Sequence, residues 1–196
     1  MARNKSVEID ALDRDGCGVR ATFRLSGDYY ATTIFAVING ASSPLLESQS
    51  KTPLQEAVRH APADSRPALL LTGSGEGNYW SATVTPMTDI HFALLGFDFA
   101  CRRGRSAPPP VVEYRFAPDV AAEPHYENGV LLRAHGREYL LRAAEMPTSL
   151  STEHVTTCQL QLSPSSIRIE PLGSPHVTTR STVQWRFEVS AIRSRA

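Results

Sequence analysis

The chain has 196 residues, of which 41% are hydrophobic and 20% charged, and this ordinary globular composition excludes a disordered or fibrous protein. Its 20 basic and 20 acidic side chains balance, which argues against nucleic acid as the partner because phosphate binding normally needs a basic excess. No apolar run is long enough to cross a bilayer or to form a secretory signal, so we expect a cytoplasmic protein that does not contact membranes.

Short runs of alternating polar and apolar residues dominate the chain and predict an all-β fold that is mainly antiparallel. The first two runs, Val7–Leu12 and Val19–Leu25, flank the turn-forming segment Asp13–Gly18 and predict a hairpin. The next run, Tyr29–Ile38, is apolar on both faces and predicts a central strand.

One segment predicts a helix rather than a strand. Thr52 is a suitable N-cap, and Gln55 occupies the position that a capping box gives to Glu or Gln. On a helix, Leu54 and Val58 would share a face. We therefore expect one short helix over Pro53–His60, closing an open end or edge of the β structure.

The rest of the chain predicts further strands and a sandwich or barrel-like architecture. These strands are expected over 68–71, 79–85, 90–95, 97–101, 111–116, 130–134, 138–143, 155–162, 166–170 and 182–190. His135 and Gly136 are expected to turn the chain between two of them. In the last strand, strict alternation assigns Val183, Trp185, Phe187 and Val189 to the core and Gln184, Arg186 and Glu188 to a polar face.

The proline-rich segment 102–110 divides the chain near its middle. We favour a single β-rich domain over residues 1–196. The alternative is a pair of β subdomains, 1–104 and 111–196, joined by this connector.

Catalytic and metal-binding motifs do not emerge from the sequence. The six histidines form no H-E-x-x-H or H-x-H pattern, and the calcium-like start at Asp13 has Arg24 where the bidentate Glu is needed. The glycine-rich run Gly73–Gly77 precedes a strand instead of a helix, which favours a loop between strands over a phosphate site. The three cysteines form no C-x-x-C pair and are expected to be reduced, with Cys101 buried. No catalytic residue, metal or cofactor is predicted.

Two groups of residues are candidates for ligand binding. The first comprises Arg102, Arg103 and Arg105, whose guanidinium groups could hold an anionic ligand or a partner protein. The second comprises Tyr79 and Trp80, of which alternation sends one to the core and the other outward.

These features favour a non-catalytic binding or assembly module. The alternatives are a small enzyme, whose site joins a histidine to a distant carboxylate, and a ligand-carrying β-barrel. The ligand, the enzyme question and the oligomeric state stay open at this point.

Overall fold

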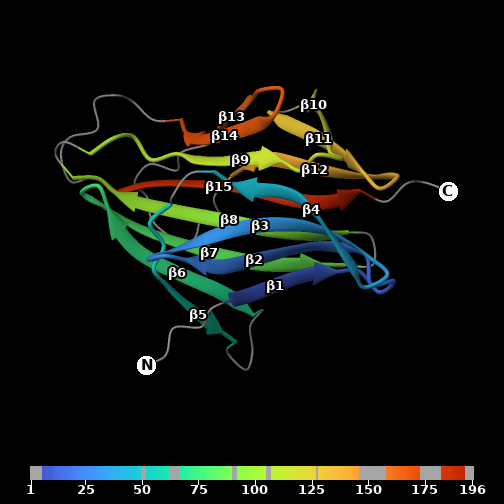
Figure 1. Ribbon diagram of the computed structural model, residues 1–196, viewed down its shortest axis with the longest axis horizontal. Helices are drawn as coiled ribbons and strands as arrows, with labels where there is room; N and C mark the ends of the chain where they lie inside the picture. Colours follow the sequence, from blue (N-terminus) through green and yellow to red (C-terminus); the bar gives the residue numbers. More distant parts are fainter. Residues whose placement is uncertain are drawn as a thin grey trace.

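The computed structural model describes residues 6–49, 52–61, 67–89, 92–104, 107–126, 128–145, 158–172 and 182–192. These residues form fifteen strands in two antiparallel sheets that pack face to face, which confirms the all-β prediction and gives a sandwich (Figure 1). None of the described residues is helical, so none forms a helix suited to spanning a membrane.

The first sheet has seven strands in the order β1-β2-β3-β4-β9-β14-β13. The N-terminal strands are joined by hairpin turns, and the remaining three come from the second half of the chain. The bounds are β1 Ser6–Leu12, β2 Gly18–Ser26, β3 Tyr29–Ile38, β4 Ala41–Ser48, β9 Val112–Phe116, β13 Cys158–Leu162 and β14 Ser166–Pro171.

The second sheet has eight strands in the order β10-β11-β12-β15-β8-β7-β6-β5. The C-terminal strand β15 lies inside this sheet, between β12 and β8. The bounds are β5 Glu56–His60, β6 Ala68–Gly75, β7 Asn78–Thr88, β8 Ala93–Arg102, β10 Ala121–His125, β11 Gly129–Ala134, β12 Arg137–Ala144 and β15 Thr182–Ile192.

Strands from both sides of the proline-rich segment pair within each sheet. In the first sheet β4 pairs with β9, and in the second β8 pairs with β15. The single-domain organisation itself stays a prediction.

Stacked aromatic rings fill the centre of the sandwich. All four core residues expected in β15 are buried, and Trp185 is fully so. Its ring stacks on Phe99 of β8 with centroids 5.3 Å apart and meets the Trp80 ring edge-on at 5.8 Å. Phe97 and Phe187 stack at 4.7 Å. Aromatic burial on two adjacent strands therefore makes β8 and β15 the centre of the core.

The opposite face of β15 departs from expectation, because Arg186 and Glu188 are only 8% and 7% exposed. Arg186 Nη1 donates to both carboxylate oxygens of Asp98, at 3.0 and 3.1 Å, and its Nη2 donates to Glu188 Oε1 at 3.0 Å. Arg142 donates to the other Glu188 oxygen at 2.9 Å. A Cβ at Gly96 would lie 2.5 Å from Arg186 Nη2, so glycine there makes room for the guanidinium. Mutual pairing is what allows these charges to be buried.

The predicted helix over Pro53–His60 is wrong. Residues 52–55 are extended, and Glu56–His60 is the edge strand β5. The Leu54 carbonyl accepts a hydrogen bond from Tyr30 N, and Gln55 N donates to the Thr72 carbonyl, both at 2.8 Å. Residues 52–55 thereby bridge the two sheets, and we call them the bridging segment. Backbone pairing with both sheets outweighs the weak helical preference of a short capped segment.

The side chains of the bridging segment and of β5 also differ from the helical expectation. Leu54 is buried in the core, whereas Val58 is 59% exposed, so the two do not share an apolar face. Residues 52–55 lie at one end of the sandwich as extended chain (Figure 1).

Besides β5, two strands that the sequence did not predict each contain a proline. β4 includes Pro44, which lies beside a register shift in its pairing with β3, and β10 includes Pro124 at the sheet edge. Proline is tolerated in strands at edges and irregularities, where its missing N–H costs little. The runs expected at 90–95 and 97–101 are one strand, β8, and residues 90–91 and 155–157 lie outside the described part.

The expected turn at His135–Gly136 is confirmed as a two-residue hairpin turn with positive φ at both positions. The loop expected over Gly73–Gly77 is shorter than predicted: residues 73–75 belong to β6, and only Glu76–Gly77 form the two-residue turn. In the first hairpin, Asp13 Oδ1 accepts hydrogen bonds from the backbone N–H groups of Asp15 and Cys17, at 2.9 and 3.0 Å. The Asp13 loop is therefore a side-chain-stabilised turn.

The edges of the two sheets meet at β1 and β5. The Arg59 guanidinium of β5 donates a hydrogen bond to the backbone carbonyl of Glu8 in β1. One charged side chain thus links the outermost strand of each sheet.

We predict that Trp185→Ala lowers the free energy of unfolding by about 3 to 5 kcal/mol, because it leaves a cavity among the stacked rings. Trp185→Phe is the matched control: it keeps a ring on Phe99 and removes an indole N–H that has no hydrogen-bond partner among the described residues. Urea unfolding measures both, and equal losses for the two variants would contradict the role given to ring stacking.

We predict that Arg186→Met costs about 3 to 5 kcal/mol, because it leaves Asp98 without its cation and Glu188 with Arg142 alone. Burial already raises the pKa of Asp98, while Arg186 opposes that rise. Without the arginine, the Asp98 carboxyl binds its proton more tightly in the folded state than in the unfolded state. Lowering the pH from 7 to about 5 should therefore recover part of the lost unfolding free energy. The control is Arg168→Met, which breaks an exposed pair with Glu170 and should cost under about 1 kcal/mol. A loss independent of pH would contradict the electrostatic account.

We predict that Cys101 and Cys158 resist alkylation in the folded protein. Both are free and fully buried, and burial raises the pKa of each thiol to about 11. Iodoacetamide at about pH 8 should label these two only after unfolding, since the thiolate is the reactive form. Peptide mass spectrometry locates the label, and rapid labelling of native Cys101 would show that the central strand opens.

Candidate functional site

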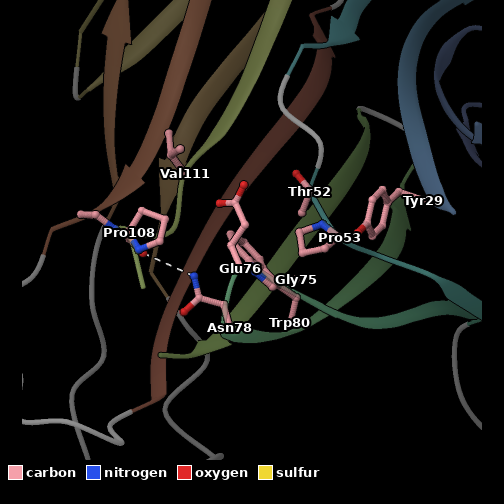
Figure 2. A pocket seen from close by; sticks show the side chains of 10 residues that line it. Tyr29, Thr52, Pro53, Gly75, Glu76, Asn78, Trp80, Pro108 and Val111 are labelled. Carbon is pink, nitrogen blue, oxygen red and sulfur yellow. Dashed lines mark hydrogen bonds between the residues drawn. The ribbon is translucent and has the colours of Figure 1, made fainter. Parts of the chain in front are cut away.

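A cavity of about 530 Å³ lies at the end of the sandwich that the bridging segment closes. It is walled by the start of β3, the bridging segment, the β6–β7 hairpin and the proline-rich connection that precedes β9 (Figure 2). We call it the hairpin cavity. Its described lining residues are Tyr29, Thr52, Pro53, Gly75, Glu76, Asn78, Trp80, Pro108, Pro109 and Val111.

The glycine-rich run shapes this cavity by letting backbones approach each other. A Cβ at Gly73 would lie 1.8 Å from the Pro53 carbonyl oxygen, and one at Gly75 would lie 2.8 Å from Pro53 Cβ. A Cβ at Gly104 would lie 2.4 Å from the carbonyl oxygen of Gly77 at the hairpin turn. The glycines therefore hold the hairpin tightly between the bridging segment and the connection that follows β8.

Asn78 supplies the most unusual polar group of the cavity. Its side chain is buried, with the residue 3% exposed, and Nδ2 donates to the Pro108 carbonyl at 3.3 Å (Figure 2). That bond fixes the amide orientation, because the flipped amide would set two oxygens against each other. Oδ1 is then left without a hydrogen-bond partner in the described structure. An unsatisfied buried acceptor typically costs about 1 to 3 kcal/mol of folding free energy.

Glu76 is the charged residue among the described lining residues of the hairpin cavity. It sits at the tip of the β6–β7 turn with φ of 53°, and Figure 2 shows its side chain rising between Pro108 and Thr52. It is exposed and forms no ion pair with any described residue. The cavity therefore offers acceptors and negative charge.

The two aromatic candidates from the sequence are separated by the sheet. Trp80 is 7% exposed, lines the hairpin cavity and packs against Trp185. Tyr79 is 66% exposed and lies on the outer face, opposite Arg102 in the β7–β8 pairing. This confirms that one of the pair faces inward and the other outward.

The arginine candidates have different environments. Arg102 is exposed at the end of β8, whereas Arg103 Nη2 donates to the Ala107 carbonyl at 3.0 Å and its Nε is buried without a partner in the described structure. Arg105 lies outside the described residues. An anion site built from the three stays a prediction.

Sequence reasoning missed Asn78, Glu76 and Tyr29 as cavity residues. Both the glycine-rich run and the proline-rich segment stood out in the sequence, but they lie about 30 residues apart, and only strand pairing brings Asn78 to Pro108. The proximity of those two unusual segments was the missing information.

Histidine chemistry is not found at this cavity. Among the described residues, His60, His125 and His135 are exposed, and none lines the hairpin cavity. His135 borders a second cavity, of about 550 Å³, next to Glu138, but that carboxylate is paired with Arg133 at 3.0 Å. No group of three or more possible metal ligands occurs in the described part of the chain.

Comparison with known proteins adds no assignment to this geometry. No protein family matches the chain, and no curated protein resembles it.

Proposed function

We propose that the chain is a non-catalytic binding module whose ligand occupies the hairpin cavity. The observation that carries the proposal is the hairpin cavity of about 530 Å³, which combines proline and aromatic walls with the exposed carboxylate of Glu76. Ligand sites usually enclose roughly 300 to 1,000 Å³ and combine apolar walls with a few placed polar groups.

The lining chemistry favours binding over catalysis. The described lining residues include no histidine, cysteine or lysine, which are the side chains that most readily act as base or nucleophile near neutral pH. The thiols with raised pKa values, Cys101 and Cys158, are buried in the core instead.

The construction of the site also suits recognition. Hydrogen bonds from Tyr30 and Gln55 fasten the bridging segment to both sheets, and close backbone contacts hold the hairpin against it. A wall that is already ordered loses little conformational entropy when the ligand arrives, which favours affinity.

The alternative functions find less support. A carrier barrel would enclose its ligand between the sheets, but there the rings of Trp185, Phe97 and Phe187 occupy the centre. An enzyme built on a histidine and a carboxylate finds no support at the hairpin cavity, because none of the described histidines lines it.

We predict that fragments from a chemically diverse library bind the hairpin cavity and that Val111→Trp abolishes this binding by filling it. The matched control is Val58→Trp on the exposed strand β5, which should leave binding unchanged. Ligand-observed NMR reports binding, thermal unfolding confirms that both variants fold, and mass spectrometry should recover the fragments chemically intact.

Two results would contradict this proposal. If the native protein binds no fragment, or if the Val111→Trp variant binds the fragments as well as the native protein does, the cavity is not a ligand site. If bound fragments are chemically converted by the native protein, the module is an enzyme.

A further inference from the structure

The dipeptide Asn-Gly occurs twice in the chain, as Asn39–Gly40 and as Asn128–Gly129. Asparagine followed by glycine is especially prone to deamidation, because glycine has no Cβ to hinder its backbone nitrogen when that nitrogen attacks the asparagine side chain. Both asparagines have positive φ, of 50° and 55°. The φ angle therefore does not distinguish the two sites, whereas their surroundings do.

The first dipeptide lies at an exposed tip. Asn39 and Gly40 form the two-residue turn between β3 and β4, closed by the pair of Ile38 with Ala41, so the nitrogen of Gly40 belongs to no ladder pair. A Cβ at Gly40 would meet no atom within 4 Å. Asn39 Oδ1 accepts a hydrogen bond from the Cys17 thiol at 3.8 Å, and a thiol is a weak donor. The Asn39 amide is therefore loosely held.

The second dipeptide is fixed on both sides. Asn128 Nδ2 donates to the Cys158 carbonyl at 2.8 Å, and Asn128 Oδ1 accepts a hydrogen bond from Leu160 N at 3.3 Å. The amide thus pairs with the edge of β13 as the backbone of a neighbouring strand would. Gly129 is buried and lies opposite Arg142 in the β11–β12 ladder. Ring closure at Asn128 has to break both side-chain hydrogen bonds beside a glycine that the sheet holds.

We propose that Asn39 is a site of spontaneous deamidation in the folded protein and that Asn128 is protected from it. Ring closure requires Asn39 to leave its turn conformation, which at an exposed two-residue turn opens the closing pair alone. The inference concerns the opposite side of β3 from its start at the hairpin cavity and does not depend on the proposed function.

The reaction uses water and no other co-reactant. The Gly40 nitrogen attacks Asn39 Cγ, so the N–Cγ bond forms and the Cγ–Nδ2 bond breaks. The Gly40 amide proton passes to the leaving nitrogen, which departs as ammonia and leaves a succinimide ring. Water then cleaves one of the two ring C–N bonds. Cleavage at Cγ gives aspartate, and cleavage at the main-chain carbonyl gives isoaspartate.

Both products alter the β3–β4 turn. Each replaces a neutral amide with a carboxylate at the position that contacts Cys17 Sγ. Isoaspartate also routes the main chain through the former side chain, which lengthens the backbone by one carbon. A two-residue turn joins its strands with a fixed backbone twist, so the longer backbone should loosen the closing pair of Ile38 with Ala41.

The experiment incubates the protein in mildly alkaline buffer, folded and in urea, and follows the conversion of amide to acid at each asparagine by peptide mass spectrometry. In the folded protein Asn39 should convert at least about tenfold faster than Asn128, because Asn128 must first lose two hydrogen bonds. In urea the two rates should become similar, because the dipeptide is the same. Equal rates in the folded protein, faster conversion at Asn128, or conversion of Asn39 only in urea would each overturn the proposal.

Two variants at the same position separate the site from its consequence. Asn39→Gly keeps a residue suited to positive φ and removes the amide, so the folded variant should no longer form the acidic species that ion exchange separates from aged native protein. Asn39→Asp supplies the carboxylate on a backbone of normal length. Aged protein rich in isoaspartate should have a lower Tm than Asn39→Asp, and equal Tm values would contradict the loosening of the β3–β4 turn.

Discussion

The register between β8 and β15 is the constraint on which the rest of the structure depends. The ladder runs from Thr182 opposite Arg102 to Ala191 opposite Ala93. It sends Trp185 and Phe187 inward to the ring stack and sets Arg186 opposite Asp98 on the outer face. A slip of one residue would bury charge in the core and expose the rings, so the hydrophobic and ionic patterns specify the same alignment.

Much of the fold could be predicted from sequence because a strand with one buried face alternates in its own residues. That alternation correctly predicted that one of Tyr79 and Trp80 faces the core and the other faces outward, and the structure shows that Trp80 is the buried one. It could not identify β4 or β10, whose residues favour strands only weakly and which exist because neighbours pair with them. The helix error at Leu54 has the same origin, because its hydrogen bond to Tyr30 comes from a distant strand.

The candidate site was less accessible to sequence reasoning than the fold. A cavity depends on which loops meet, and the contact of Asn78 with Pro108 follows from the order of strands in the sheet rather than from any motif. The charged groups near the arginine candidates and near the hairpin cavity have opposite signs. The arginine hypothesis concerns anions near Arg102 on the outer face, whereas the hairpin cavity presents the carboxylate of Glu76.

The link from Arg59 to the Glu8 carbonyl has a consequence for self-association. Sheets with open edges tend to polymerise, because an unpaired edge accepts a strand from another molecule. Here the guanidinium of β5 occupies a carbonyl on the outermost strand of the opposite sheet, and Pro124 in β10 removes a donor from the far edge of its own sheet. Both devices act on backbone groups that a second copy would need, so they disfavour strand pairing with another molecule at these edges.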